Sequence, residues 1–210
     1  RAHRLLGQVY SLQTQVDRAE AEYRQVTEIL LDLAEGDPRP EYRYLLAENN
    51  QHLSHLLADL DRTQEASQLG LDTMRELTTL ADEFPNVPPY NSALAVAYNN
   101  LGLLSLKLGR DEEAIQYLRR QLSTLEHLVS GSPQDSGYVA RLIDSQQILL
   151  GALWSVGRLE EAKQVLDSLA PGELEQIIRD NIISEEDRER FRKHESDLLY
   201  KTLYLTSEND

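Results

Sequence analysis

This 210-residue chain contains two histidines whose spacing would allow them to bind a metal ion. His52 and His55 are three residues apart, so on a helix both side chains project from one side, and Glu48 could supply a third ligand. No other histidine is near them in the sequence, and no H-E-x-x-H motif is present. We therefore predict no metal site and interpret the pair as polar residues of an exposed helix face. The alternative is a module that senses a metal ion or a small molecule.

Acidic residues cluster in two segments, GRDEEA at 109–114 and GRLEEA at 157–162. General acid–base catalysis needs carboxylates whose pKa values are perturbed in a cleft, whereas acids in the first turn of a helix stabilise the positive end of its dipole.

The sequence also lacks the glycine-rich, His-Arg-Asp and Asp-Phe-Gly motifs of protein kinases, the P-loop and the G-x-S-x-G motif. We predict that the 210 residues contain no enzyme active site and bind no cofactor, although a kinase domain could lie outside them.

The charge balance argues against nucleic acid as the main partner. The chain has 36 Asp and Glu against 21 Lys and Arg, a net charge of -15, whereas proteins that bind nucleic acid present a basic face. No apolar run approaches the ~18 residues that cross a bilayer, so we expect no membrane partner and a cytoplasmic location. The absence of cysteine excludes disulfides and thiolate metal sites. An acidic protein favours protein partners that are basic or neutral.

Small residues recur along the chain at a nearly constant spacing. Four alanines stand at intervals of 47, 48 and 48 positions: Ala19, Ala66, Ala114 and Ala162. A small residue stands twelve positions before each of the first three alanines: Gly7, Ser54 and Gly102. Three tyrosines share the longer of these intervals: Tyr42, Tyr90 and Tyr138. Repetition of this length is typical of solenoids, in which each unit buries its apolar face against its neighbours.

One repeat is predicted to form two helices joined by a tight turn. Apolar residues at helical spacing predict a helix over 90–108, and the acids that follow predict a second helix over 111–129. We expect Gly102 and Ala114 to face each other across this helix pair, where their small side chains let the two helices approach closely. Glycines that can adopt the left-handed conformation of a helix end stand at the turns: Gly109 and Gly157.

These small residues, with the leucines and turns around them, resemble the tetratricopeptide repeat (TPR). The matching stretches are LLGQVYSL, LGLLSLKLGRDEEAIQYL and LLGALWSVGRLEEAKQVL. The usual repeat has about 34 residues, so the longer period of this chain implies longer helices. The stretch LADEFPNVPPYNSALAVAYNNLG resembles long-helix TPR arrays of bacterial proteins, several of which follow a serine/threonine protein kinase domain.

The resemblance implies an all-α, right-handed solenoid of antiparallel helix pairs. We expect four repeats at about 1–36, 37–84, 85–132 and 133–170. Beyond them we expect a C-terminal helical segment at 171–206 that caps the last repeat, and a disordered tail at 207–210.

The resemblance also implies a concave face lined by the first helix of each repeat. Nine residues are expected to line this groove: Arg4, Gln8, Gln51, His52, His55, Asn99, Asn100, Leu103 and Gln147. Side-chain amides both donate and accept hydrogen bonds, which suits the backbone of an extended peptide. Arg4 is the only cation of the set, so we do not expect the groove to capture an acidic chain terminus. The alternative is a solvated groove without a ligand.

The function that follows is a protein–protein interaction scaffold, part of a larger signalling protein, that binds a partner peptide or protein in its groove. The alternative is a regulatory or spacer segment of a serine/threonine protein kinase that binds nothing itself. These two hypotheses differ in one respect: the first requires the groove residues, and the second requires only the core.

Overall fold

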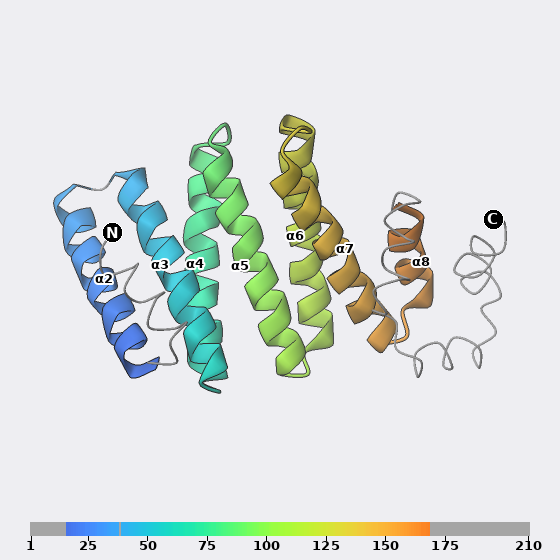
Figure 1. Ribbon diagram of the computed structural model, residues 1–210, viewed down its shortest axis with the longest axis horizontal. Coiled ribbons are helices and arrows are strands. Elements are labelled where there is room, and N and C mark those ends of the chain that lie inside the picture. The colour runs from blue at the N-terminus through green and yellow to red at the C-terminus, as the bar shows by residue number, and fades with distance from the viewer. Residues whose placement is uncertain (1–15, 38, 169–210) are drawn as a thin grey trace. The chain divides into compact units, whose positions relative to one another are not determined.

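The computed structural model describes residues 16–37 and 39–168 of the chain (Figure 1). Within them the regular secondary structure is α-helical, as predicted: α2 (Val16–Gly36), α3 (Pro40–Asp59), α4 (Thr63–Glu83), α5 (Pro88–Lys107), α6 (Asp111–Gly131), α7 (Ser136–Ser155) and α8 (Leu159–Ser168). Several predicted features lie outside the described residues: Arg4, Gly7, Gln8, the capping segment 171–206 and the tail 207–210. None of the described helices is long and apolar enough to span a bilayer.

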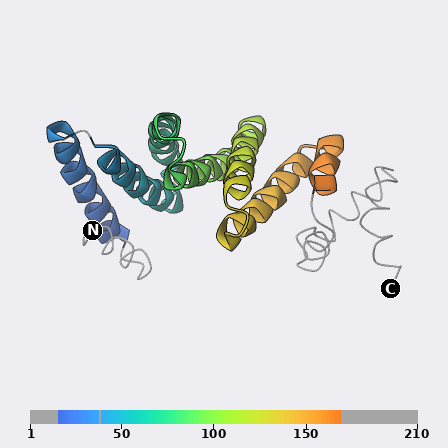
Figure 2. The same ribbon diagram turned by 90° about the horizontal axis from the view of Figure 1, so that it is seen from above.

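The chain divides into two compact units, residues 1–145 and 146–210. In the first unit, α2 to α6 are connected by short turns, and consecutive helices zigzag along the unit (Figure 2). The helix predicted over 90–108 is α5, which begins at Pro88 because proline is favoured in the first turn of a helix. The helix predicted over 111–129 is α6, and it extends to Gly131.

Three helix-to-helix turns share one backbone geometry. Gly109 and Gly157 have φ values of +69° and +76°, and Asp61 has a φ of 59°. The amide of Arg110 donates to the carbonyl oxygen of Ser105 at 2.8 Å, which is the hydrogen bond that closes a helix ending in a left-handed residue. Glycine adopts this conformation without strain, and aspartate is among the residues that tolerate it.

The two helices of each pair in this unit approach closely. A Cβ atom added to Gly102 would lie 3.0 Å from Cγ and Cδ2 of Leu118 and 3.6 Å from the carbonyl oxygen of Ala114. Ser54 has the corresponding place in α3, and its hydroxyl donates to the carbonyl oxygen of Ala66 at 2.8 Å. One pair is therefore held by close packing and the other by a buried hydrogen bond.

Each hydrophobic cluster takes side chains from consecutive helices. The cluster at α2, α3 and α4 includes Tyr23, Leu57 and Ala66. The cluster at α3, α4 and α5 includes Ala47, Leu80 and Tyr98. Arg43 of α3 adds ion pairs to Glu76 and Glu83 of α4. The core of the first unit thus passes from one helix pair to the next, and it positions α3 and α5 beside each other.

Candidate interaction site

A hollow of about 160 Å³ lies between α3 and α5. Three of the residues predicted for the groove line it: His55, Asn100 and Leu103. The other lining residues are Ser54, Ala58, Asp59, Leu104 and Lys107. Leu103 is 44% exposed, whereas Leu104 beside it is 7% exposed. The hollow therefore combines an accessible aliphatic side chain with an amide, an imidazole and charged groups.

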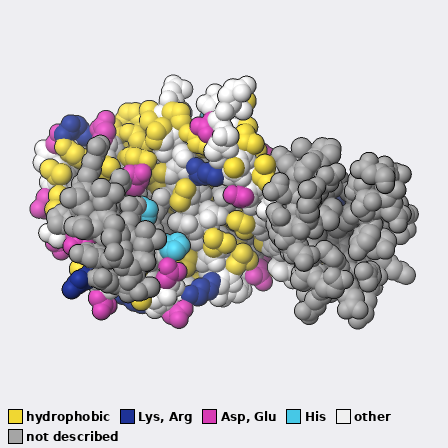
Figure 3. All heavy atoms as spheres, in the orientation of Figure 1, with side chains coloured by type: hydrophobic (Ala, Val, Ile, Leu, Met, Phe, Trp, Pro, Cys, Tyr) yellow, Lys and Arg dark blue, Asp and Glu magenta, His cyan; other side chains and the backbone are white. Residues whose placement is uncertain are grey.

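The charged groups around the hollow are already paired within the protein. His55 Nδ1 lies 3.2 Å from Asp59 Oδ2. Lys107 Nζ donates to the carbonyl oxygen of Ala58 at 2.9 Å and to Asp61 Oδ1 at 2.8 Å. The hydrogen bond and the charge of Lys107 lower the pKa of Asp61 below its usual value. On the face shown in Figure 3, histidine and acidic side chains lie next to one another.

The remaining predicted groove residues have separate environments. Gln51 Nε2 donates to the carbonyl oxygen of Ala93 at 2.7 Å, so this amide connects α3 to α5 inside the protein. His52 stacks on Tyr23 of α2, with ring centroids 5.9 Å apart. Asn99 Oδ1 is buried and has no hydrogen-bond partner among the described residues. Gln147 is half-buried on α7, in the second unit. The structure thus brings together His55, Asn100 and Leu103 at one hollow, and it gives Gln51, His52 and Asn99 separate surroundings.

The two histidines considered for metal binding have other neighbours in the structure. Their contacts are the Tyr23 ring for His52 and the Asp59 carboxylate for His55. Within residues 16–37 and 39–168, no group of three or more histidine, aspartate or glutamate side chains is placed to hold a metal ion.

Two charged residues of the hollow were missed by the sequence analysis. Asp59 and Lys107 are the last residues of α3 and α5 and are one repeat period apart, so they occupy equivalent places on the two helices. The repeat period of the sequence would have identified this pair of opposite charges. The sequence would not have shown how this lysine is paired, because Lys107 contacts the carboxylate of Asp61 in the neighbouring turn.

Comparison with known proteins supports the repeat fold. Residues 95–124, from α5 into α6, match the tetratricopeptide repeat family model. The solved structure of nearly identical TPR-like repeats, from a Podosopora anserina protein assigned as a kinesin light chain, has a TM-score of 0.60 and 16% sequence identity. The match covers 100% of this chain and 97% of that chain. The fold is a TPR-like repeat solenoid. The comparison with curated proteins returned no match.

The TPR-like fold directs attention to interaction surfaces. Folds of this kind generally mediate protein–protein interactions and are typically non-catalytic. A likeness at 16% identity carries the fold and not the partner of the other protein. The residues of the hollow between α3 and α5 are therefore the basis for a functional proposal.

Proposed function

We propose that the chain is an interaction scaffold whose α3 and α5 helices bind an extended segment of a protein partner. The observation that supports this proposal is the exposure of Leu103 in a hollow between two helices. Leu101 and Leu104 on the same helix are 1% and 7% exposed, whereas Leu103 is 44% exposed. Covering such a side chain with an apolar group of a partner is favourable, because each buried methylene contributes about 0.8 kcal/mol.

The chemistry of the hollow defines the partner. An aliphatic side chain of the partner would contact Leu103 and Leu104, and the Asn100 amide would hydrogen-bond the peptide backbone beside it. The net charge of -15 favours a segment that is basic or neutral. The scaffold would serve within a larger signalling protein, as the resemblance to kinase-attached arrays implies.

Selection from a displayed library of random peptides tests the proposal. Peptides that bind the 210-residue chain are titrated against wild type, Leu103→Ala, Asn100→Ala and the control Leu31→Ala. Leu31 is 48% exposed on α2, outside the hollow, and so matches Leu103 in type and exposure. We expect Leu103→Ala to weaken binding about tenfold, Asn100→Ala to weaken it less, and Leu31→Ala to leave it unchanged.

The outcomes separate the alternatives. Equal affinity of wild type and Leu103→Ala, with unchanged circular dichroism, would place the binding surface elsewhere. Failure to enrich any peptide would favour the spacer or regulatory segment. For a basic peptide, association should slow as salt concentration rises, because screening weakens the attraction to an acidic protein.

A further inference from the structure

A second and larger hollow lies between α2 and α4, with α3 as its floor. Its volume is about 360 Å³. The lining residues are Arg24, Thr27, Glu28, Asn50, Leu53, Glu65, Gln68, Leu69 and Asp72. None of them belongs to the predicted groove or to the hollow between α3 and α5. This is a separate surface of the first unit, and it needs its own explanation.

The equivalent junction of α4, α5 and α6 shows which side chains occupy the matching place one helix pair later. The helices α4, α5 and α6 begin 47, 48 and 48 residues after α2, α3 and α4, respectively. These are the intervals that separate the repeated alanines. At these offsets three lining residues have a larger aromatic or thioether side chain as their counterpart: Tyr98 for Asn50, Met74 for Thr27 and Tyr117 for Leu69. All three counterparts pack in or against one hydrophobic cluster. Tyr98 is only 7% exposed.

The hollow between α2 and α4 therefore corresponds to the space of two aromatic rings and a thioether. Protein interiors are close-packed, so smaller side chains at equivalent backbone positions leave unfilled space between the helices. Two leucines line the hollow among polar and charged side chains: Leu53 of α3 and Leu69 of α4. An aromatic ring fits against these two leucines, because rings of that kind occupy the matching place one helix pair later.

The rim carries a hydrogen-bond acceptor at a matching place. At the junction of α4, α5 and α6, called the filled junction below, the Tyr117 hydroxyl donates to Glu113 Oε1 at 3.3 Å. Glu65 lies one repeat period before Glu113 and lines the hollow. The tyrosine is replaced by Leu69 in α4, but the carboxylate is retained. A phenol placed in the hollow would thus find an acceptor where Tyr117 finds one.

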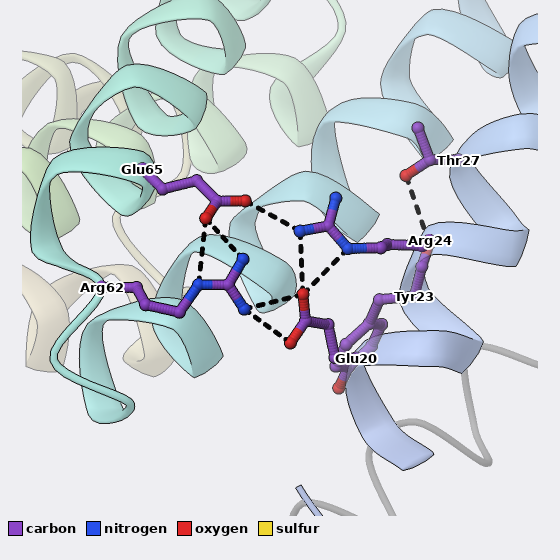
Figure 4. A network of polar contacts seen from close by, with 6 residues as sticks. All are labelled: Glu20, Tyr23, Arg24, Thr27, Arg62 and Glu65. Atoms are coloured by element: carbon purple, nitrogen blue, oxygen red, sulfur yellow. Dashed lines mark hydrogen bonds and ion pairs between the residues drawn. The ribbon is translucent and has the colours of Figure 1, made fainter. Parts of the chain in front are cut away.

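An ion-pair network fixes one end of the hollow (Figure 4). Arg24 Nη2 of α2 lies 2.8 Å from Glu65 Oε1 at the start of α4, and Arg62 Nη1 lies 2.8 Å from Glu20 Oε2. Figure 4 shows the two arginines and two glutamates alternating between the helices. Because these contacts join α2 to α4 without a ligand, the walls of the hollow are set before binding, which lowers the entropic cost of association.

We propose that this hollow binds a tyrosine side chain of a protein partner. The ring would lie on Leu53 and Leu69, and the phenol hydroxyl would donate a hydrogen bond to Glu65. This surface is independent of the hollow between α3 and α5, so the two proposals succeed or fail separately.

The test uses p-cresol, the side-chain analogue of tyrosine, with the ¹⁵N-labelled 210-residue chain. We expect saturable shifts of the backbone resonances of Thr27, Asn50 and Leu69 in the millimolar range. Thr27→Met, which introduces the residue found at position 74, should weaken binding by at least about tenfold. The matched control Thr79→Met changes an exposed residue of α4 and should leave binding unchanged.

Two further compounds keep the test decisive if Thr27→Met does not fold. Toluene lacks the hydroxyl and should bind more weakly than p-cresol, so equal binding would overturn the role of Glu65. N-acetyl-arginine amide tests a basic side chain, and preferential binding of that compound would overturn the assignment to tyrosine. The proposal also fails if p-cresol gives no saturable shifts, or gives the same shifts in Thr27→Met.

Discussion

Two equivalent helix junctions of the first unit show how one backbone arrangement can be stabilised in different ways. At α4, α5 and α6, Tyr98 belongs to a hydrophobic cluster that includes buried side chains of α4 and α5, with Tyr117 of α6 packed against it. At α2, α3 and α4, the position equivalent to Tyr98 is Asn50, a hollow remains, and charged side chains connect the outer helices. The residues equivalent to Glu20 and Arg24 are Ser67 and Leu71, so the filled junction cannot form the same network. The difference teaches that side-chain volume and charge change along the solenoid while the helix positions are kept.

Removing the aromatic side chain from the filled junction should have the largest effect. We expect Tyr98→Asn to lower the free energy of unfolding by about 3 kcal/mol, because it deletes a buried ring and leaves a polar group in its place. The converse change, Asn50→Tyr, should cost little, since the hollow can accept a ring. Denaturant unfolding of both variants measures the asymmetry, and equal losses would show that the two junctions are not differently packed.

The close contact at Gly102 should give the next largest effect. We expect Gly102→Leu to cost roughly 1 to 3 kcal/mol, because Leu118 already lies 3.0 Å from the position of a Cβ atom. Ala114→Leu, on the facing helix, should act in the same direction because Ala114 is fully buried. Gly131→Leu is the control, since a Cβ atom at that glycine meets nothing within 4 Å. Unfolding midpoints that are as high in Gly102→Leu as in the control would contradict the close approach of α5 and α6.

The sequence predicts the helices well because their signals are local. Asp61, Gly109 and Gly157 are one repeat period apart in the sequence, and all three residues have positive φ. The candidate site was less predictable, because its geometry depends on which side chains reach across neighbouring helices. The resemblance implied a place for Gln51 on the groove face, and in the structure its amide donates a hydrogen bond to the carbonyl oxygen of Ala93. The hollow at Asn50 depends on side-chain volumes from three helices, which no single stretch of sequence contains.

The ion-pair network at the unfilled junction should contribute the smallest effect, and this effect should depend on pH. Burial raises the pKa of Glu20, but hydrogen bonds from Arg24 and Arg62 and their charges outweigh it, so the pKa is lowered from 4.5. A carboxyl whose pKa is lowered by folding stabilises the protein above its unfolded pKa and loses that contribution as pH falls through the folded value.

We therefore expect Glu20→Gln to lower the free energy of unfolding by up to about 1 kcal/mol at pH 7. The difference from wild type should shrink as the pH falls below 4.5, the usual value for this carboxyl. Glu35→Gln, an exposed change near the other end of α2 and outside this network, is the control and should leave the free energy of unfolding at pH 7 nearly unchanged. Urea unfolding at several pH values measures both variants. A difference for Glu20→Gln that stays constant from pH 7 to below pH 4 would show that its ionised form does not hold α2 against α4, and the hollow would then have no preset walls.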